Sequence, residues 1–155
     1  MLWYDQDELS INRAKVKPAA GTCSSYNVIY GFVCKQCSMC YVGRTTRPLK
    51  ERVTEHRGKF YELLANPSIR CQDDFDFSDC YSLGAHLIDN HGILNREQFD
   101  ENYEVFILCN SSPNNLEINE HRFIQNLKTI KPFGINSVDP LGIPLLSIFV
   151  NPLAN

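Results

Sequence analysis

The sequence predicts a mixed α/β domain, because three strand-type segments and three helix-type segments are interleaved along the chain. Residues 26–33 alternate loosely and are rich in Val, Ile, Tyr and Phe, which indicates a strand. Residues 39–43 indicate a second, shorter strand, and the hairpin loop between the two carries cysteines. Residues 103–109 form the third predicted strand.

The first predicted helix begins at Pro48, with Thr46 as a candidate cap. One face of this helix collects Leu49, Val53, His56, Phe60 and Leu63. Residues 66–80 are polar and acidic, which indicates a loop. Residues 82–90 indicate a short helix, and Gly92 lies just past its end.

The last predicted helix begins at Ser112-Pro113 or at Asn114, where Glu117 completes a capping-box analogue. It runs to about Ile130, because Pro132 and Gly134 end it. A chain of 155 residues suits one domain with a substantial core. We expect a lead-in and linker over 1–25, the folded domain over 26–138 and a packed C-terminal tail over 139–155.

The composition is typical of a soluble globular protein, with 43% hydrophobic and 21% charged residues. No apolar run approaches the length that crosses a bilayer, and the N-terminal residues lack the pattern of a signal peptide. We therefore expect no membrane partner.

The charge distribution is bipolar, although the net charge of −3 by itself argues against a nucleic-acid partner. Residues 44–59 contain six Lys or Arg and two Glu, a local charge of +4, whereas residues 70–104 carry a local charge of −7. A basic face of this kind attracts phosphate. Apart from Arg52, the candidate DNA contacts in this run are Arg44, Arg47, Lys50, Arg57 and Lys59.

The seven cysteines are an odd number, which favours reduced thiols and an intracellular location over a disulfide framework. Cys34 and Cys37 have the two-residue spacing of zinc ligands, and His86 and His91 are separated by four residues, also within the zinc range. The two pairs together predict a structural zinc site. Cys40 is a rival ligand, and buried thiols with surface histidines are the alternative.

Glu120 is the most informative single residue. It falls about 40° from Leu116 on a helical wheel, within the apolar stripe of the last predicted helix, whereas Glu117 falls about 100° away, at the edge. A carboxylate that faces a core is costly unless it is paired or bound to a metal. The alternative to a metal ligand is a buried salt bridge, for example to an arginine of the first helix.

Arg52 and His56 are neighbours on the first predicted helix, at positions i and i+4. An arginine can hold two phosphate oxygens, and a histidine in the apolar stripe is either a core residue or part of a site. Tyr30 and Tyr41 are expected on adjacent antiparallel strands. Because the ordinary pKa of a tyrosine is near 10, either would need a cation or a metal to act as a base.

These positions resemble the GIY-YIG nuclease family over about residues 26–138. Val28-Ile29-Tyr30 and Tyr41-Val42-Gly43 stand where the family has its two triplets. The chain especially resembles the endonuclease domain of Penelope-like retroelements, which also has two cysteines between the triplets and a later histidine pair. The remaining family positions are matched by Arg52, His56, Glu120 and, after a Lys-Pro turn, Asn136.

The resemblance implies a three-stranded antiparallel sheet flanked by helices, and hydrolysis of one DNA strand. Glu120 would hold a single Mg²⁺ or Mn²⁺, and Arg52 would stabilise the charge that builds on phosphate. Tyr30 would receive the proton of the attacking water or orient it. Tyr41 and His56 would position water or phosphate, and Asn136 would brace the site.

Two positions depart from the family pattern: Val28 replaces the first glycine and Val42 replaces the central isoleucine. No catalytic position is lost. We therefore predict a nuclear DNA endonuclease that nicks target DNA for retroelement integration, with DNA and a covalently linked upstream reverse transcriptase as partners. The alternatives are a repair or junction-resolving nuclease and a non-catalytic, zinc-stabilised binding module.

Overall fold

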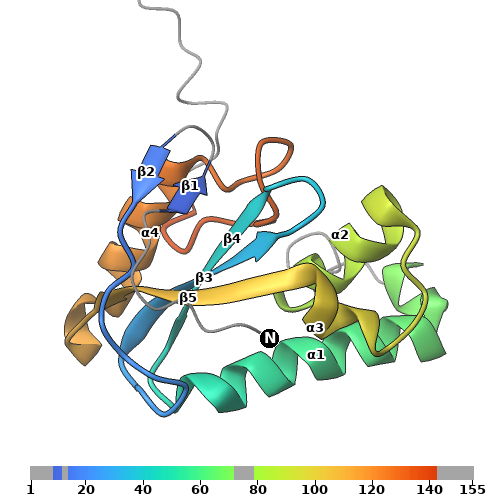
Figure 1. Cartoon of the computed structure of the whole chain (residues 1–155), viewed down its shortest axis with the longest axis horizontal. Helices are drawn as coiled ribbons and strands as arrows, with labels where there is room; N and C mark the ends of the chain where they lie inside the picture. Colours follow the sequence, from blue (N-terminus) through green and yellow to red (C-terminus); the bar gives the residue numbers. More distant parts are fainter. Residues whose placement is uncertain (1–8, 12–13, 72–78, 143–155) are drawn as a thin grey trace, which may run out of the picture.

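The computed structural model describes residues 9–11, 14–71 and 79–142. Its centre is an antiparallel sheet of β3 (Val28–Cys34), β4 (Cys40–Thr45) and β5 (Tyr103–Asn110), in the order β4-β3-β5 (Figure 1). These are the three predicted strands, rich in the β-branched and aromatic residues that favour a pleated, buried surface. The predicted α/β class with a three-stranded antiparallel sheet is confirmed.

In the described part of the chain, four helices surround the sheet: α1 (Leu49–Ala65), α2 (Ser82–His91), α3 (Gln98–Asn102) and α4 (Leu116–Leu127). The same part also contains the short 3-10 turns η1 (Pro67–Cys71), η3 (Asp79–Tyr81) and η4 (Pro113–Asn115). Among the described residues, none of the helices combines the length and the hydropathy that spanning a bilayer requires.

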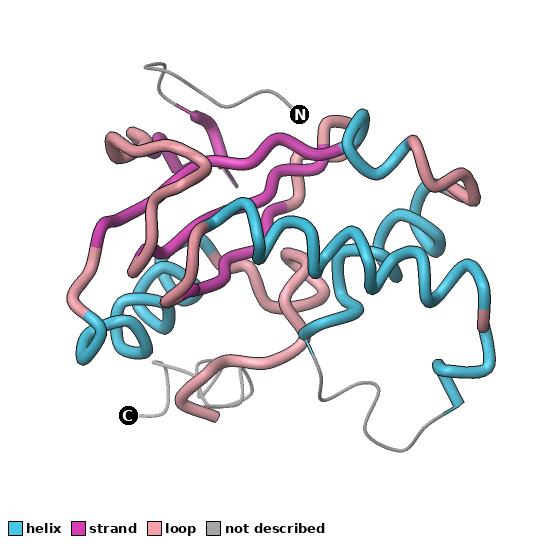
Figure 2. Tube along the Cα trace, turned by 90° about the horizontal axis from the view of Figure 1, so that it is seen from below, coloured by secondary structure: helices cyan, strands magenta, loops and turns pink. Residues whose placement is uncertain are grey.

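Side chains alternate between two cores, one on each face of the sheet. On the first face, Tyr30, Phe32 and Tyr41 pack with residues of α1, α2 and α3. On the second face, Ile29 and Val42 pack with residues of α4. Figure 2, viewed from below, shows α1 running across the first face. Because both faces are covered, β3 is buried along its whole length.

Some boundaries differ from the predicted ones. The last helix ends at Leu127 rather than near Ile130, because Lys128 adopts a left-handed conformation with φ 51°. The helix α3 was not predicted, since five residues are too few to show a period, although its Phe99 is fully buried. The predicted loop over 66–80 contains η1 and η3 at its two ends, and residues 72–78 lie outside the described part.

The predicted linker and tail are described in part. Within residues 1–25, β1 (Leu9–Ile11) pairs with β2 (Ala14–Val16) in an antiparallel hairpin that the sequence did not predict. Further on, Ala19 donates a backbone hydrogen bond to Ile107 of β5 at 2.8 Å, so this segment packs along the edge of the sheet. Of the predicted tail, residues 143–155 lie outside the described part.

Candidate functional site

Tyr30, His56 and Arg52 meet in one hydrogen-bonded group although they come from β3 and α1. The Tyr30 hydroxyl oxygen lies 2.8 Å from Nε2 of His56, and Nε of Arg52 donates to the same oxygen at 3.2 Å. Tyr41 of β4 adds its ring, with its centroid 5.3 Å from that of His56 and 6.4 Å from that of Tyr30. Arg52 also donates to Glu55 at 2.8 Å.

Tyr30 and His56 are both buried, and burial sets their protonation states. Burial raises the pKa of Tyr30 to about 12, although Arg52 works against this. Burial, helped by the Arg52 charge, lowers the pKa of His56 to about 3. At neutral pH the tyrosine is therefore protonated and the imidazole is neutral, so Nε2 of His56 is free to accept the Tyr30 hydroxyl proton.

The free energy of unfolding should depend on pH because of this buried histidine. The pKa of a histidine is near 6.5 in the unfolded chain but about 3 for His56 in the folded protein. The stability that neutral His56 contributes is therefore complete above pH 6.5 and is lost as the pH falls towards 3. We expect the chain to lose about 3 kcal/mol from this residue between pH 6.5 and 4. Urea unfolding of the wild type and of His56→Gln at both pH values gives the change in unfolding free energy with pH for each protein. The effects of the other titrating groups cancel when the two changes are subtracted. Equal pH slopes in the two proteins would contradict the prediction.

Gly43 leaves room for the Tyr30 ring. The two residues are paired across β3 and β4, and a Cβ atom on Gly43 would overlap the hydroxyl and ring of Tyr30. The last position of the second triplet therefore has a packing role beside the site.

We expect Gly43→Ala to lower the unfolding free energy by about 1–3 kcal/mol and to displace Tyr30, since added volume in a packed core forces side chains out of place. Gly58→Ala is the matched control, because no atom lies within 4 Å of the added Cβ on α1. It should stabilise the helix by about 0.5–1 kcal/mol. Urea denaturation of both variants is the measurement, and a Gly43→Ala protein as stable as wild type would show that the ring is not held by this contact.

Asn136 is bound to the edge of β4. Its side chain accepts from the Val42 N–H at 2.9 Å and donates to the Val42 carbonyl at 2.8 Å, so it forms an extra rung beside Tyr41. It also donates to Asp79 at 3.1 Å. Asp79 accepts further hydrogen bonds from the backbone N–H groups of Ser137 and Val138, which fixes the loop that carries Asn136.

Glu120 faces a cavity of about 280 Å³ lined by Tyr41, Arg44, Arg52, Asp79, Glu120, Val138 and Pro140. Its side chain is only 12% exposed, and its carboxylate lies 3.4 Å from Nε of Arg44. Burial raises the pKa of Glu120 to about 7, an effect that Arg44 opposes and Asp79 strengthens. Glu120 therefore forms a salt bridge, as the alternative to a metal ligand required, but its partner is Arg44 of β4 and not an arginine of the first helix. The pKa of Glu120 stays raised, so the charge of Arg44 does not fully offset the cost of burying the carboxylate.

Four further residues form a compact cluster that could hold a metal such as zinc: Cys34, Cys37, His86 and His91. Their ligand atoms all lie within 4.8 Å of one another. Nε2 of His86 and Nε2 of His91 are 3.3 Å apart, and the Cys34–His91 and Cys37–His86 contacts measure 3.4 and 3.3 Å. Tetrahedral zinc, with bonds of about 2.0–2.3 Å, requires ligand atoms about 3.3–3.8 Å apart.

The surroundings of the cluster also fit a metal. The Asn90 amide lies 3.0 Å from Nδ1 of His86 and can fix the orientation of the ring. Burial raises the pKa of the Cys34 thiol, whereas the backbone N–H groups of Cys37 and Gln36 lower it. Cys40, the rival ligand, lies in the core on the opposite face of the sheet and is not part of the cluster.

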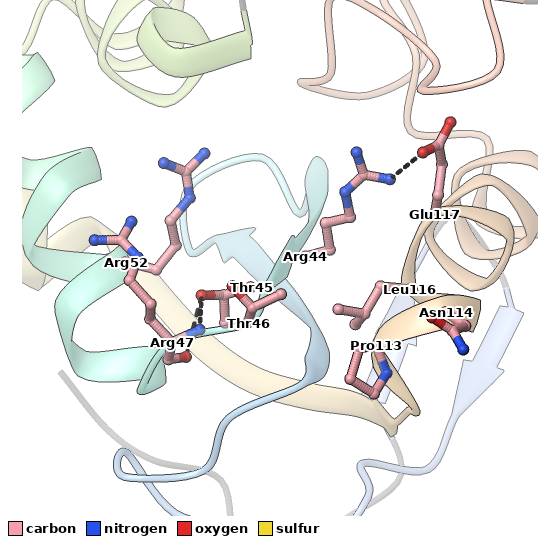
Figure 3. Close-up of a pocket in the computed structure, with 9 residues that line it drawn as sticks. All are labelled: Arg44, Thr45, Thr46, Arg47, Arg52, Pro113, Asn114, Leu116 and Glu117. Atoms are coloured by element: carbon pink, nitrogen blue, oxygen red, sulfur yellow. Dashed lines mark hydrogen bonds and ion pairs between the residues drawn. The ribbon is translucent and has the colours of Figure 1, made fainter.

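The predicted DNA contacts are not all in one place. Arg44 and Arg47 line a second cavity of about 420 Å³ together with Arg52 (Figure 3). Lys50 is exposed on the first turn of α1. Arg57 instead donates to Asp100 of α3 at 2.9 and 3.1 Å. Lys59 pairs with Glu62 at 3.0 Å and lies over the ring of Tyr81.

Two residues at the site were missed in the sequence. Asp79 lies in an acidic run in which no pattern separates it from its neighbours, although an acidic residue just before a predicted helix was an available signal. Asp139 is buried and accepts from Gln125 at 2.6 Å, and it contacts Nδ1 of His121 at 2.8 Å. It therefore binds the start of the tail to α4 directly beside Glu120.

In comparisons with protein-family models, with curated proteins and with solved structures, nothing matches this chain.

Proposed function

We propose that the chain is a metal-dependent DNA endonuclease that hydrolyses one phosphodiester of a duplex. The observation that carries this proposal is the convergence of Tyr41, Arg52 and Glu120 on a single cavity, with Tyr30 and His56 directly behind Arg52. These residues come from two strands and two helices, and they are the ones that the resemblance to GIY-YIG nucleases singles out.

The proposed divalent cation would lie in this cavity. Its lining offers the oxygens of Glu120, Asp79 and Tyr41, and Mg²⁺ and Mn²⁺ prefer oxygen ligands. Glu120 would hold the ion, since Asp79 is already engaged by backbone N–H groups. When bound, the ion supplies charge that polarises the phosphate and stabilises the leaving oxygen.

Arg52 would bind the scissile phosphate. Its side chain lines the cavity and is 29% exposed, and its Glu55 partner is a carboxylate that a phosphate can replace. In the pentacoordinate transition state the extra negative charge falls on the oxygens that Arg52 contacts.

Tyr30 and His56 would move the proton. The attacking water gives a proton to the Tyr30 oxygen while the Tyr30 hydroxyl proton passes to Nε2 of His56, 2.8 Å away. The new P–O bond forms as the bond to O3′ breaks, so the products are a 3′-hydroxyl, protonated from solvent, and a 5′-phosphate. Phosphate binding assists, because it neutralises the Arg52 charge that lowers the pKa of His56.

A non-catalytic, zinc-stabilised binding module is the second candidate. The observation that favours it is the burial of Tyr30, whose side chain is 0% exposed in the free protein. Catalysis requires Arg52 to shift towards a phosphate so that water reaches the hydroxyl, whereas a binding module requires no such shift.

Plasmid nicking tests the proposal. Supercoiled plasmid is incubated with the chain and Mg²⁺ or Mn²⁺, with and without a chelator of divalent ions. We expect open-circular product only with the ion present, and 3′-hydroxyl ends that a polymerase extends. A folded protein that leaves the plasmid intact under all these conditions would favour the binding module.

The narrower role, nicking of target DNA so that a tethered reverse transcriptase can prime from the 3′ end, is supported by the resemblance to Penelope-type endonuclease domains and by the Cys/His cluster. We propose that this cluster holds one structural zinc. It lies at the β3–β4 hairpin and on α2, and its residues line no part of the cavity at Glu120.

DNA binding by this chain should be weak and strongly dependent on salt. Few phosphates can be neutralised at the arginine-lined cavity, and each released counterion contributes about 0.9 to the slope of log affinity against log salt. We expect Arg47→Gln to lower this slope by about 0.9 in a fluorescence anisotropy titration of a duplex. Arg57→Gln should leave it unchanged, because Arg57 is paired with Asp100. An equal loss in both variants would show that DNA extends along α1 as far as Arg57.

A further inference from the structure

A second cavity adjoins the one at Glu120. It measures about 420 Å³ and shares Arg44 and Arg52 with the first. In Figure 3, Arg47 and Arg52 lie on one side of it, while Arg44 extends towards Glu117 on the other. Thr45 and Thr46 line the space between them. Three arginines around one open space suit an anion with several oxygens.

The arginines of this cavity are held by carboxylates of the chain. Glu55 pairs with both Arg47, at 2.5 Å, and Arg52, at 2.8 Å. A phosphate that enters the cavity can replace Glu55 on either guanidinium, because both kinds of group present paired oxygens to the arginine fork.

Arg44 is held less well than the other two. Its Nε lies 3.4 Å from Glu120 and its Nη1 lies 3.3 Å from Glu117. Nη1 is buried, and its contact with Glu117 lacks the geometry of a hydrogen bond. A phosphate oxygen that meets this N–H group in line would supply the hydrogen bond that Glu117 does not make.

We propose that the larger cavity is a subsite for a second DNA phosphate, next to the scissile one, and that Arg44 binds this phosphate by leaving Glu120. The inference rests on the proposed function and adds a coupling to it. In the free protein the Arg44 guanidinium is paired with Glu120, the carboxylate that the divalent ion needs. When DNA binds, Arg44 moves from Glu120 to the phosphate, so DNA and the ion favour one another's binding.

The coupling follows from charge. A guanidinium and a divalent cation on the same carboxylate repel one another, and the buried setting of Glu120 weakens screening of that repulsion. When Arg44 moves to a phosphate, its repulsion of the cation at Glu120 is relieved and its charge is paired with that of the phosphate. By linkage, DNA must raise the affinity for the ion by the same factor as the ion raises the affinity for DNA.

Mn²⁺ binding, followed by electron paramagnetic resonance of the free ion, tests this. A Tyr30→Phe background keeps the DNA intact. In that background we expect a short duplex to raise the Mn²⁺ affinity about tenfold, within the usual range of coupling between sites. Adding Arg44→Gln should tighten Mn²⁺ binding without DNA and remove most of the increase caused by DNA.

Arg47→Gln is the matched control, because it removes the same charge from the far side of the cavity and leaves the Arg44–Glu120 contact in place. It should weaken duplex binding and, at saturating duplex, preserve the coupling. An Arg44→Gln protein with unchanged Mn²⁺ affinity and unchanged coupling would overturn the inference while the nuclease proposal stands. Mn²⁺ binding that persists equally in Glu120→Gln would overturn both.

Discussion

Replacement of Glu120 by alanine is expected to abolish plasmid nicking while the domain stays folded. The carboxylate is 12% exposed, faces the cavity that Arg52 and Tyr41 also line, and contacts Arg44 only at 3.4 Å. Because its pKa is raised to about 7 by burial, its charge is costly in the free protein and its loss removes little stability. We expect nicking to fall by at least about a thousandfold, as when a principal electrostatic group is lost, and the unfolding free energy to change by less than about 1 kcal/mol.

Glu117→Ala is the control for this result. Glu117 lies one turn earlier on α4 and contacts the same arginine at 3.3 Å, but its side chain is 53% exposed and lines only the larger cavity. Its loss should leave nicking nearly unchanged. Glu120→Gln separates charge from shape and should be as inactive as Glu120→Ala. Cleavage retained in either Glu120 variant would remove Glu120 from the catalytic assignment.

If the Cys/His cluster holds a metal as proposed, its removal should lower the stability of the domain substantially. We expect one zinc per chain when the protein is purified without added metal. The ion would tie the β3–β4 hairpin to α2 across a segment of some fifty residues, from Cys37 to His86. Chelation, or Cys37→Ser, should lower the unfolding free energy by at least about 2 kcal/mol, because the ion binds the folded state and not the unfolded one.

Cys71→Ser is the matched control, because Cys71 is also exposed but lies in η1, outside the cluster. It should keep both the zinc and the stability of the wild type. Metal analysis and thermal unfolding of the three proteins are the measurements. Zinc-free wild type, or Cys37→Ser as stable as Cys71→Ser, would show that these four residues pack together without an ion.

The strands and the long helices could be predicted from the sequence because local pattern decides them. β3 is a run of β-branched and aromatic residues bounded by turns, and α1 repeats its buried residues at helical spacing from Leu49 to Leu63. The Cys/His cluster could be predicted for a similar reason: the cysteine pair and the histidine pair each have a short, characteristic spacing, so only the meeting of the two pairs depends on the fold.

The electrostatic partners could not be predicted in the same way, because they depend on which surfaces meet. Arg44 and Glu120 are 76 positions apart, and no local pattern connects them. From the sequence, an arginine on α1 was as reasonable a partner for Glu120 as Arg44. Asp79 is one of several acids in its segment, and only the packing of the 136–138 loop gives it three donors in addition to the Ser82 hydroxyl. The short α3 lacks the length for a periodic signal, and tertiary burial of Phe99 stabilises it instead.

The side chain of Asn136 has a consequence for how this protein meets other molecules. β4 and β5 are the outer strands of the sheet, and exposed outer strands invite pairing with another chain, which leads to aggregation. Here Asn136 occupies the hydrogen-bonding groups of Val42, and Ala19 occupies the carbonyl of Ile107 on the other side. A peptide or a second copy that tried to add a strand beside Tyr41 would first have to expel Asn136. The residue that braces the proposed site therefore also protects the chain against self-association through this edge.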